Sequence, residues 1–280
     1  MEAILKDPAG AVIGLDFDGT LAPIVADPAA ARIHPEAPRV LAELGRHVKA
    51  VAIVTGRPVA TALRLGTGLT DAPGSADAPG STDAPGSTDA PGLADVPGLV
   101  VLGHYGFERW EDGRVSAPPP PPGVLEAEAE LQLLLVSLGV KGVAIEDKGR
   151  AVAVHTRRSA DPEGTLEALR EPLAALAKKH GLVVEPGRLV LELRPPGMDK
   201  GHALGLFLAE RAARSVMFVG DDLGDLAAFD AVRNSGLPGV NVCSGSAEVT
   251  ALAERADIVV DGPDGVVALL RELASAFKGH

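Results

Sequence analysis

Short apolar runs alternate with helical patterns in two separate parts of the chain. Three of these runs end directly in a polar cluster, and they occupy residues 12–15, 50–54 and 216–219. Such near-continuous runs are typical of strands buried on both faces of a parallel sheet. The patterns between them predict helices at 38–46, 58–65, 200–213 and 223–232. This alternation predicts an α/β fold with a doubly wound, Rossmann-like parallel-sheet core.

The middle of the chain follows a different pattern. Asp161 and Pro162 suit the N-cap and first turn of a helix that Gly181 ends. A further helix and four strands are predicted at 124–138, 143–145, 152–154, 182–184 and 189–193. The order αββαββ indicates a small α+β domain inserted into the larger one. We therefore expect a core domain formed by 1–112 and 195–280, and an inserted domain at 113–194.

A six-residue repeat interrupts the core pattern at residues 71–98. Its units read DAPGSA, DAPGST, DAPGST, DAPGLA and then DVPG, with almost no large apolar residue. Because such a segment buries too little surface to offset its ordering entropy, we interpret it as a flexible, low-complexity insertion before a strand at 99–102. A solenoid or a calcium-binding repeat is disfavoured, since the units lack a strand or helix. The prolines at 118–122 predict a stiff linker.

Composition narrows the class of protein further. The 280 residues suffice for two domains, and the apolar share of 46% supports a sizeable core. The formal net charge of −12 disfavours a nucleic-acid binder, which needs a basic face. No apolar run is long enough for a membrane span, and the acidic start of the chain does not resemble a secretory signal. With its one cysteine, Cys243, expected to be a small buried residue, we predict a cytoplasmic protein.

Carboxylates gather where the apolar runs end. Asp16 and Asp18 follow the first run, and Asp221, Asp222 and Asp225 follow the third. In doubly wound folds, ligands bind beyond the carboxyl ends of the strands, so these acids are expected in one site. Like charges at such spacing need a cation or a shared proton, and hard oxygen ligands suit Mg²⁺. We therefore predict a magnesium site formed by these five aspartates.

The same strand ends supply a nucleophile and groups that bind phosphate. An aspartate such as Asp16 can attack phosphorus to give an acyl phosphate, which leaves Asp18 to protonate the leaving oxygen and then activate water. The residues expected to bind phosphate are Gly19, Thr55, Gly56, Arg57 and Lys200. Arg57 is equally suited to pairing with an acid.

Each of these motifs has an ordinary structural explanation when it stands alone. Aspartates at a strand end are common turn and cap residues, T-G-R is an ordinary turn, and a lone lysine such as Lys200 is usually solvated. The G-D-D-L-G-D stretch at 220–225 suits a calcium-like loop or a helix start. Their joint occurrence at the ends of buried strands favours catalysis.

Together the motifs resemble those of the haloacid-dehalogenase superfamily of phosphatases. D-F-D-G-T-L at 16–21 is similar to the first motif, Thr55 in V-T-G-R to the second, Lys200 to the third and the stretch at 220–225 to the fourth. The second aspartate of the first motif points to phosphate transfer, because the true dehalogenases of the superfamily lack it. The resemblance also makes the inserted α+β domain a type-2 cap, which closes over the substrate.

The resemblance implies roles for individual residues. Asp16 would be the nucleophile and Asp18 the general acid and base. Magnesium would be held by Asp16, the Asp18 carbonyl and Asp221, with Asp222 and Asp225 in support.

Within the superfamily, the chain is most similar to the trehalose-6-phosphate phosphatases. The supporting stretches are G-H-Y-G-F-E at 103–108, E-D-K at 146–148, V-H-T-R at 154–157 and L-E-L-R-P-P-G-M-D-K-G-H-A-L at 191–204. The resemblance implies hydrolysis of trehalose 6-phosphate to trehalose and phosphate through an aspartyl-phosphate. Tyr105 stands where relatives often have histidine. We place His104 and Tyr105 at the cap entrance, in packing or in substrate contact.

One face of the cap sheet is predicted to be polar. Alternation along a strand puts Glu192 on the face opposite Leu191 and Leu193, and the other cap strands follow the same rule. We expect five charged residues of this face to contact the sugar: Glu146, Lys148, His155, Arg157 and Glu192. The alternative is a solvated face held by cross-strand ion pairs.

Two other functions stay open. One is a phosphatase of another sugar phosphate, such as glucosyl- or mannosyl-3-phosphoglycerate or sucrose phosphate. The other is a non-catalytic sensor of sugar phosphates, which is disfavoured because a pure binder needs no nucleophile such as Asp16. We expect a small-molecule sugar phosphate as partner, no nucleic acid and no membrane. Docking of a trehalose-phosphate synthase is not readable from the sequence.

Overall fold

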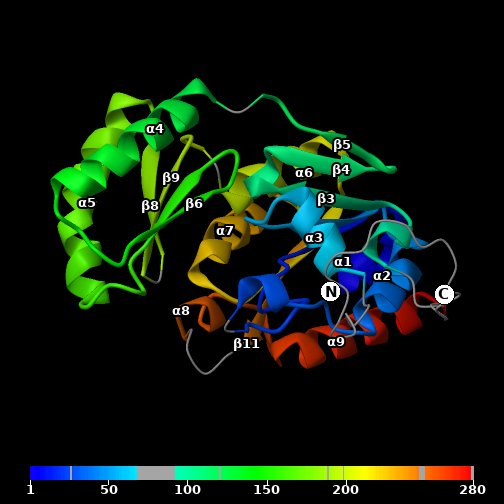
Figure 1. Cartoon of the computed structure of the whole chain (residues 1–280). Helices are drawn as coiled ribbons and strands as arrows, with labels where there is room; N and C mark the ends of the chain where they lie inside the picture. Colours follow the sequence, from blue (N-terminus) through cyan, green and yellow to red (C-terminus); the bar gives the residue numbers. More distant parts are fainter. Residues whose placement is uncertain are drawn as a thin grey trace, which may run out of the picture. The chain divides into compact units, whose positions relative to one another are not determined.

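In the computed structural model, the chain folds into two compact units (Figure 1). The described residues are 1–25, 27–67, 92–119, 121–187, 189–197, 199–245 and 250–278. The core unit combines Met1–Ala117 with Asp199–His280, and the inserted unit consists of Pro118–Met198. The inserted unit therefore interrupts the core unit in the sequence.

An eight-stranded sheet forms the centre of the core unit. Its middle strands are β10 (Ser215–Gly220), β1 (Ala11–Leu15) and β2 (Ala50–Val54). The outer strands are β12 (Ile258–Asp261), β11 (Gly239–Gly245), β3 (Leu99–Gly103), β4 (Glu108–Glu111) and β5 (Arg114–Ser116). The order is β12-β11-β10-β1-β2-β3-β4-β5, and neighbours from β12 to β3 are parallel. The predicted parallel α/β core is confirmed.

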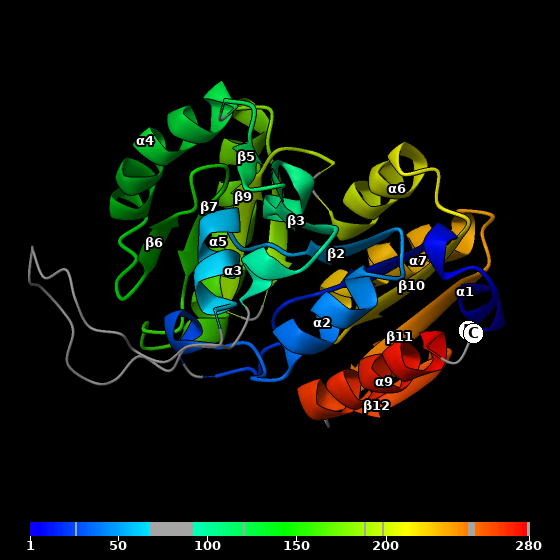
Figure 2. The same cartoon turned by 90° about the vertical axis from the view of Figure 1, so that its right-hand side faces the viewer.

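Helices cover both faces of this sheet because successive residues of a buried strand point to opposite sides. Ile13 of β1 packs in a buried cluster with α2 (Ala37–Gly45) and α9 (Gly262–Phe277). Its neighbour Val12 packs with α6 (Lys200–Glu210) and α7 (Leu226–Asn234). Figure 2 shows α2 beside α9. The unit also contains α1 (Glu2–Lys6), α3 (Val59–Leu65) and α8 (Thr250–Ala253).

The core unit differs from the sequence pattern in several places, and α1, α8, β12 and α9 are not predicted by it. The helix predicted at 223–232 begins with a 3-10 turn, Leu223–Asp225, because Asp222 and Asp225 cap the backbone there. The pattern does not predict the β4–β5 hairpin, in which Trp110 is the one buried residue. It also assigns residues 92–98 to the low-complexity insertion.

Residues 92–98 instead belong to the packed core. Leu93 and Val96 are buried against it. They are the large apolar side chains that the other repeats lack, so this end of the repeat can bury surface where the preceding units cannot. The rest of the predicted insertion, up to residue 91, lies outside the described residues.

The inserted unit consists of an antiparallel sheet with two helices on one face (Figure 1). The sheet order is β6-β7-β9-β8, with strands β6 (Ala144–Asp147), β7 (Val152–His155), β8 (Val183–Gly187) and β9 (Val190–Arg194). The helices are α4 (Pro122–Ser137) and α5 (Pro162–Lys179), which gives the predicted order αββαββ. The linker predicted at 118–122 ends in the first turn of α4, where proline is tolerated.

Alternation along the strands divides this sheet into an apolar and a polar face. Val154 and Leu191 pack against Leu131 of α4 and Leu173 of α5. Because neighbouring residues of a strand point the other way, Glu192 of β9 lies on the face that the helices do not cover.

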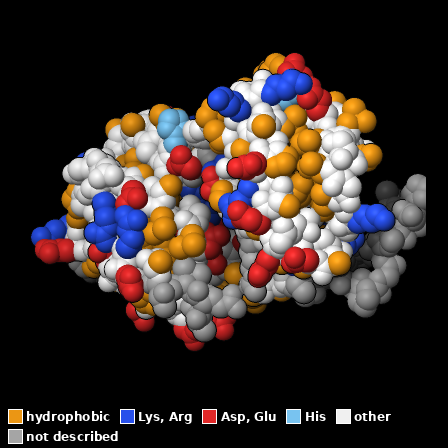
Figure 3. Space-filling model, turned by 90° about the vertical axis from the view of Figure 1, so that its left-hand side faces the viewer, with side chains coloured by type: hydrophobic (Ala, Val, Ile, Leu, Met, Phe, Trp, Pro, Cys, Tyr) orange, Lys and Arg blue, Asp and Glu red, His pale blue; other side chains and the backbone are white. Residues whose placement is uncertain are grey.

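Charged side chains of both signs share the protein surface. Figure 3 shows acidic and basic side chains interspersed on the face that it presents. Within the described ranges, no helix is both long and apolar enough to cross a membrane. Cys243 is buried in β11, as predicted.

Candidate active site

Three neighbouring strands bring the predicted polar residues to one edge of the large sheet. β10, β1 and β2 are parallel, so their carboxyl ends lie side by side. Asp16 directly follows β1, Thr55 follows β2 and Asp221 follows β10. Lys200, the first residue of α6, reaches the same edge through its contact with Asp16. The structure therefore brings the four predicted motifs together.

Lys200 lies between two carboxylates. Its Nζ is 2.8 Å from Asp16 Oδ1 and donates a hydrogen bond of 2.8 Å to Asp225 Oδ1. All three side chains are at most 7% exposed. Asp199 caps α6 by accepting a hydrogen bond from the backbone N–H of His202, which fixes the first turn. Lys200 is thus a buried, paired cation and not a solvated one.

Asp16, Asp221 and Asp225 form a buried acidic group, in which one carboxylate oxygen of each lies within 4.8 Å of the others. Burial raises the pKa of Asp16 well above its usual range and that of Asp221 to about 7. Burial raises the pKa of Asp225 as well. For Lys200, burial opposes the charge, but attraction by Asp16 and Asp225 outweighs it and raises the pKa. Lys200 therefore stays charged, and the three carboxyl groups would be stabilised in their ionised form by a further cation.

This donor set fits a divalent cation. Three buried carboxylates around one ammonium leave about two negative charges to be compensated, and carboxylate oxygens are the ligands that Mg²⁺ prefers. The turn after β1 also approaches the group closely: a Cβ on Gly19, where φ is 75°, would lie 1.9 Å from Asp221 Oδ2. Glycine at this position therefore lets the Asp221 carboxylate lie against the backbone that follows Asp16.

Ser244, which was not among the predicted site residues, holds the same turn from β11. Its hydroxyl donates a hydrogen bond of 2.7 Å to the Gly19 carbonyl, and both groups are buried. Ser244 stands one residue after Cys243 in a strand that ends at the same sheet edge, and this position is the signal that could have identified it.

Arg57 pairs with Asp18. The guanidinium donates two hydrogen bonds of 2.6 Å, from Nε to Oδ2 and from Nη2 to Oδ1. Its backbone N–H donates to Thr55 Oγ1 at 3.1 Å, so the turn after β2 is held by its own side chain. Of the two roles left open for Arg57, the pairing with an acid is present, and the acid is Asp18.

Asp222 and Asp225 play different parts in the turn after β10. The Asp222 carboxylate is exposed and accepts a hydrogen bond from Gly224 N–H, so it caps the 3-10 turn and does not join the buried acidic group. Asp225 Oδ2 accepts from the N–H groups of Asp221 and Asp222 at 3.0 and 3.2 Å. Asp225 therefore fixes the backbone that carries Asp221.

Most of the predicted sugar-contacting residues in the inserted unit form ion pairs. Lys148 Nζ donates to Glu192 Oε2 at 2.5 Å, and His155 Nε2 lies 2.8 Å from Glu146 Oε2. Arg157 is exposed beyond β7. The cross-strand pairing considered as the alternative is therefore present, and the sugar contacts stay a prediction.

Two features of this polar face were not predicted. Glu192 is only 7% exposed, and its Oε1 has no hydrogen-bond partner among the described residues. Arg194 donates a hydrogen bond of 2.7 Å to Glu185 Oε2, which lies on the neighbouring strand, and this pair was not predicted. The spacing of two residues between Glu192 and Arg194 was the available signal.

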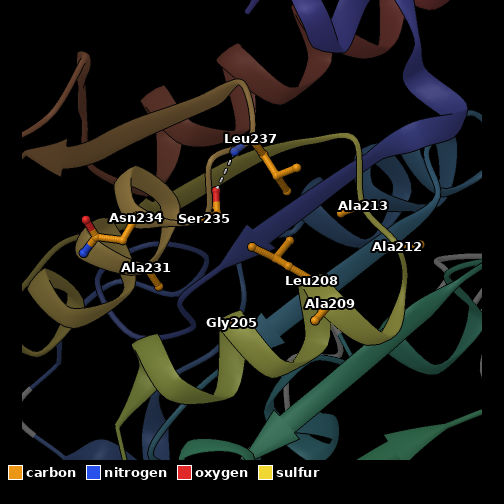
Figure 4. Close-up of a pocket in the computed structure, with 9 residues that line it drawn as sticks. All are labelled: Gly205, Leu208, Ala209, Ala212, Ala213, Ala231, Asn234, Ser235 and Leu237. Atoms are coloured by element: carbon orange, nitrogen blue, oxygen red, sulfur yellow. Dashed lines mark hydrogen bonds between the residues drawn. The ribbon is translucent and has the colours of Figure 1, made fainter.

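An apolar pocket lies elsewhere in the core unit, between α6 and α7 (Figure 4). Leu208 of α6 and Leu237 line it together with small residues such as Ala209 and Ala213. Ala213 and Leu237 precede β10 and β11, so this pocket is at the amino end of the strands. It is separate from the acidic group, which lies at their carboxyl ends.

Comparisons with known proteins show which proteins this chain is similar to. The model of the trehalose-phosphatase family matches residues 14–77 and 96–264. The probable trehalose-phosphate phosphatase of Sinorhizobium fredii is 30% identical over 240 residues, which cover 84% of this chain and 79% of that protein. Some other relatives are longer proteins, of which the chain spans between 15% and 56%.

Solved structures with the same fold span nearly the whole chain. Trehalose-6-phosphate phosphatase of Aspergillus fumigatus gives a TM-score of 0.68 at 23% identity, over 98% of this chain and 97% of that one. A haloacid dehalogenase-like hydrolase of Bacteroides thetaiotaomicron gives 0.63 at 17% identity, over 94% and 98%. At these identities the likeness concerns the fold, and it confirms the predicted superfamily fold.

Proposed function

This chain belongs to the trehalose-phosphatase family, and on that premise we propose that it hydrolyses trehalose 6-phosphate to trehalose and inorganic phosphate. Membership makes it a phosphatase, that is, a phosphoric monoester hydrolase. The observation that carries the proposal is the buried arrangement of Asp16, Lys200 and Asp221 at one sheet edge. A carboxylate beside a fixed ammonium and an acidic group is what phosphoryl transfer to an aspartate requires.

The reaction proceeds in two displacements. Asp16 attacks phosphorus, the bond from phosphorus to the sugar oxygen breaks, and Asp18 gives its proton to that oxygen. An aspartyl-phosphate and free trehalose result. Asp18 then takes a proton from water, the water oxygen attacks phosphorus, and the bond to Asp16 breaks to release phosphate. Arg57 binds both Asp18 oxygens in this structure; it would release one of them for protonation and orient this acid and base through the other.

The core unit also supplies groups that bind the phosphate. The Lys200 ammonium and the Thr55 hydroxyl lie at the same sheet edge as Asp16, and they would stabilise the equatorial phosphate oxygens. Gly19 and Gly56, which are predicted to bind phosphate, lie in the turns after β1 and β2 and would act through the backbone of these turns. When substrate enters, one of the Arg57 N–H groups that bind Asp18 would instead donate to a phosphate oxygen.

We assign Mg²⁺ as the cofactor, since phosphatases of this superfamily depend on a metal and the acidic group suits a hard cation. Asp16, the Asp18 carbonyl and Asp221 would hold it. Asp225 would support it through the Asp221 backbone, and exposed Asp222 through the same turn. When bound, the ion neutralises phosphate charge and thereby makes phosphorus more accessible to the carboxylate.

We further propose that the inserted unit, predicted at 113–194, is the cap that selects the sugar. Its polar face carries Glu146, His155 and Glu192, with Lys148 paired to Glu192, and we expect Arg157, which follows β7, to contribute as well. Most of the cations there are already paired with carboxylates, so this face favours neutral hydroxyls over a second anionic group. The buried Glu192 Oε1 supplies an acceptor for a sugar hydroxyl. These features favour a disaccharide phosphate over a phosphoglycerate. A cytoplasmic location and a synthase partner stay predictions.

Phosphate release from a panel of esters tests the substrate. We expect the highest kcat/KM with trehalose 6-phosphate, and lower values with sucrose 6-phosphate and with glucosyl- and mannosyl-3-phosphoglycerate. A higher value with one of the phosphoglycerates would replace the proposed substrate. Binding of trehalose 6-phosphate without any phosphate release would favour the sensor function instead.

A further inference from the structure

A strained turn lies beside the turn that follows β2. Between β3 and β4, His104 and Tyr105 have positive φ values of 46° and 57°. Residues other than glycine adopt this backbone conformation at an energetic cost, and it persists only where the surrounding structure enforces it. Strain of this kind is concentrated at functional sites, so the contacts that enforce it are informative.

Backbone hydrogen bonds join this turn to the predicted phosphate-binding turn. Tyr105 N–H donates to the Thr55 carbonyl at 2.9 Å, and His104 N–H donates to the Arg57 carbonyl at 3.0 Å. Glu108, at the start of β4, accepts a hydrogen bond of 2.9 Å from the Val59 N–H that begins α3. The two turns are therefore held together on both sides of Gly56.

The Tyr105 side chain occupies the space above Gly56. A Cβ on Gly56 would lie 2.7 Å from Tyr105 Oη and 2.8 Å from Cζ. Gly56 has no positive φ, so its own backbone would accept a side chain and the tyrosine ring is what excludes one. The next residue, Arg57, carries the guanidinium that binds Asp18.

We propose that Tyr105 is a positioning residue: its ring fixes the turn of Thr55, Gly56 and Arg57, and so aims Arg57 at Asp18. The positive φ places the ring over Gly56, which explains why the strain is kept. The inference rests on the proposed function, because it assigns the effect to Asp18 as general acid. Removal of the ring would loosen Arg57 and leave the buried pair of Lys200 and Asp16 in place.

A suppression experiment tests the contact itself, by thermal unfolding. Gly56→Ala should lower the Tm in the otherwise unchanged chain, because the new methyl group collides with Tyr105. In a Tyr105→Gly chain, which lacks the ring and the strain, Gly56→Ala should leave the Tm unchanged. Equal losses in both backgrounds would overturn the proposal. This measurement needs no activity, so it stands whether or not the proposed substrate is correct.

A comparison of two leaving groups tests the action through Asp18. Tyr105→Gly should lower the rate of the first displacement, measured as release of the alcohol in a single turnover, about tenfold for trehalose 6-phosphate, whose sugar oxygen needs a proton. It should lower this rate less than about threefold for p-nitrophenyl phosphate, whose leaving group needs little protonation. Tyr105→Phe keeps the ring and should keep both rates. Asp112→Gly relieves a positive φ of 49° in the β4–β5 turn and serves as the matched control.

Equal losses with the two esters, or no loss with either, would overturn the positioning role. A parent enzyme that hydrolyses p-nitrophenyl phosphate but not trehalose 6-phosphate would contradict the proposed substrate alone. In that case, the thermal suppression by Tyr105→Gly still decides whether Tyr105 controls the turn.

Discussion

The charges of the core unit and those of the inserted unit sit in contrasting environments. Lys200 and its two aspartates are at most 7% exposed, whereas the side chains of His155 and Glu146 are 39% and 52% exposed. Breaking a buried pair leaves an uncompensated charge, while an exposed pair contributes about 1 kcal/mol or less. The fold therefore fixes the charges of Lys200 and its two aspartates, and we propose that the sheet face exchanges its ion pairs for sugar hydroxyls at little cost.

The pair of Lys148 and Glu192 stands between these extremes, with side chains 25% and 9% exposed. The pair is mostly sheltered from solvent, yet Glu192 Oε1 is still without a hydrogen-bond partner in the described part of the chain. The contrast suggests a division in which the core sets the chemistry and the inserted sheet sets selectivity. Substitutions in the two regions should therefore differ in size and in kind.

The largest effect is expected from Asp16→Asn. The amide cannot act as nucleophile, so kcat should fall at least about 10³-fold. Because Lys200 keeps its pair with Asp225, the Tm should stay close to that of the parent. Phosphate release and thermal unfolding measure the two quantities. Asp112→Asn, on an exposed turn, is the matched control and should keep full activity. Undiminished turnover by Asp16→Asn would refute the nucleophile assignment and with it the contrast between the two units.

Removal of the metal should rank next. Three buried carboxylates near one ammonium should repel the phosphate ester when no divalent cation is bound. Dialysis against EDTA should lower kcat at least about 10²-fold, and added Mg²⁺ should restore it. Ca²⁺, which prefers more ligands at longer distances, should restore less. Full activity in the chelated enzyme would contradict the proposed cofactor.

Asp221→Asn should change how stability depends on pH in the metal-free protein. The folded-state pKa of about 7 lies above the ordinary 3.8, so the folded chain keeps a proton that the unfolded chain releases between these values. This carboxyl therefore contributes stability below about pH 4 that is lost as pH rises through about 7, on the order of 4 kcal/mol.

Urea unfolding with EDTA, at about pH 5 and about pH 8, measures this effect. The free energy of unfolding of the parent minus that of Asp221→Asn should become smaller at the higher pH. Subtracting the free energy of unfolding of the variant removes the contributions that all other acids make to the pH dependence. A difference that is independent of pH would contradict the assigned burial of Asp221.

The smallest effects should come from the inserted sheet, and they should fall on KM. Lys148→Met should raise KM for trehalose 6-phosphate about tenfold with little change in kcat, because it removes the sheltered pair with Glu192. His155→Gln, at an exposed pair, should change KM less than about threefold. Neither variant should affect p-nitrophenyl phosphate, which has no sugar. An equal loss with both esters would assign these residues to folding and not to selectivity.

Much of the core was predictable because its signals are local. A buried parallel strand reads as a continuous apolar run, and the polar residue that follows it must lie at the carboxyl edge of the sheet. Asp16, Thr55 and Asp221 could be placed in this way. Lys200 could be included because it lies in a recognisable motif. Its contact with Asp16, however, depends on how α6 packs against the sheet.

Other features depend on long-range packing and leave little trace in the sequence. The pattern could not decide whether Arg57 pairs with an acid, because Asp18 comes close only when β1 and β2 are neighbours. The repeat hid the buried Leu93 and Val96, since two apolar residues make no periodic pattern. Asp222 reads as a ligand in its acidic motif, yet its carboxylate is used locally as a cap.

The central claim is that Asp16 captures phosphorus while buried charges of the core unit hold it in place. Rapid mixing with trehalose 6-phosphate, acid quenching and mass spectrometry of peptides test it directly. We expect the peptide that contains Asp16 to gain the mass of one phosphoryl group within the first turnover, and the corresponding peptide of Asp16→Asn to show no such gain. Phosphate release at full rate without a phosphorylated Asp16 peptide would contradict it.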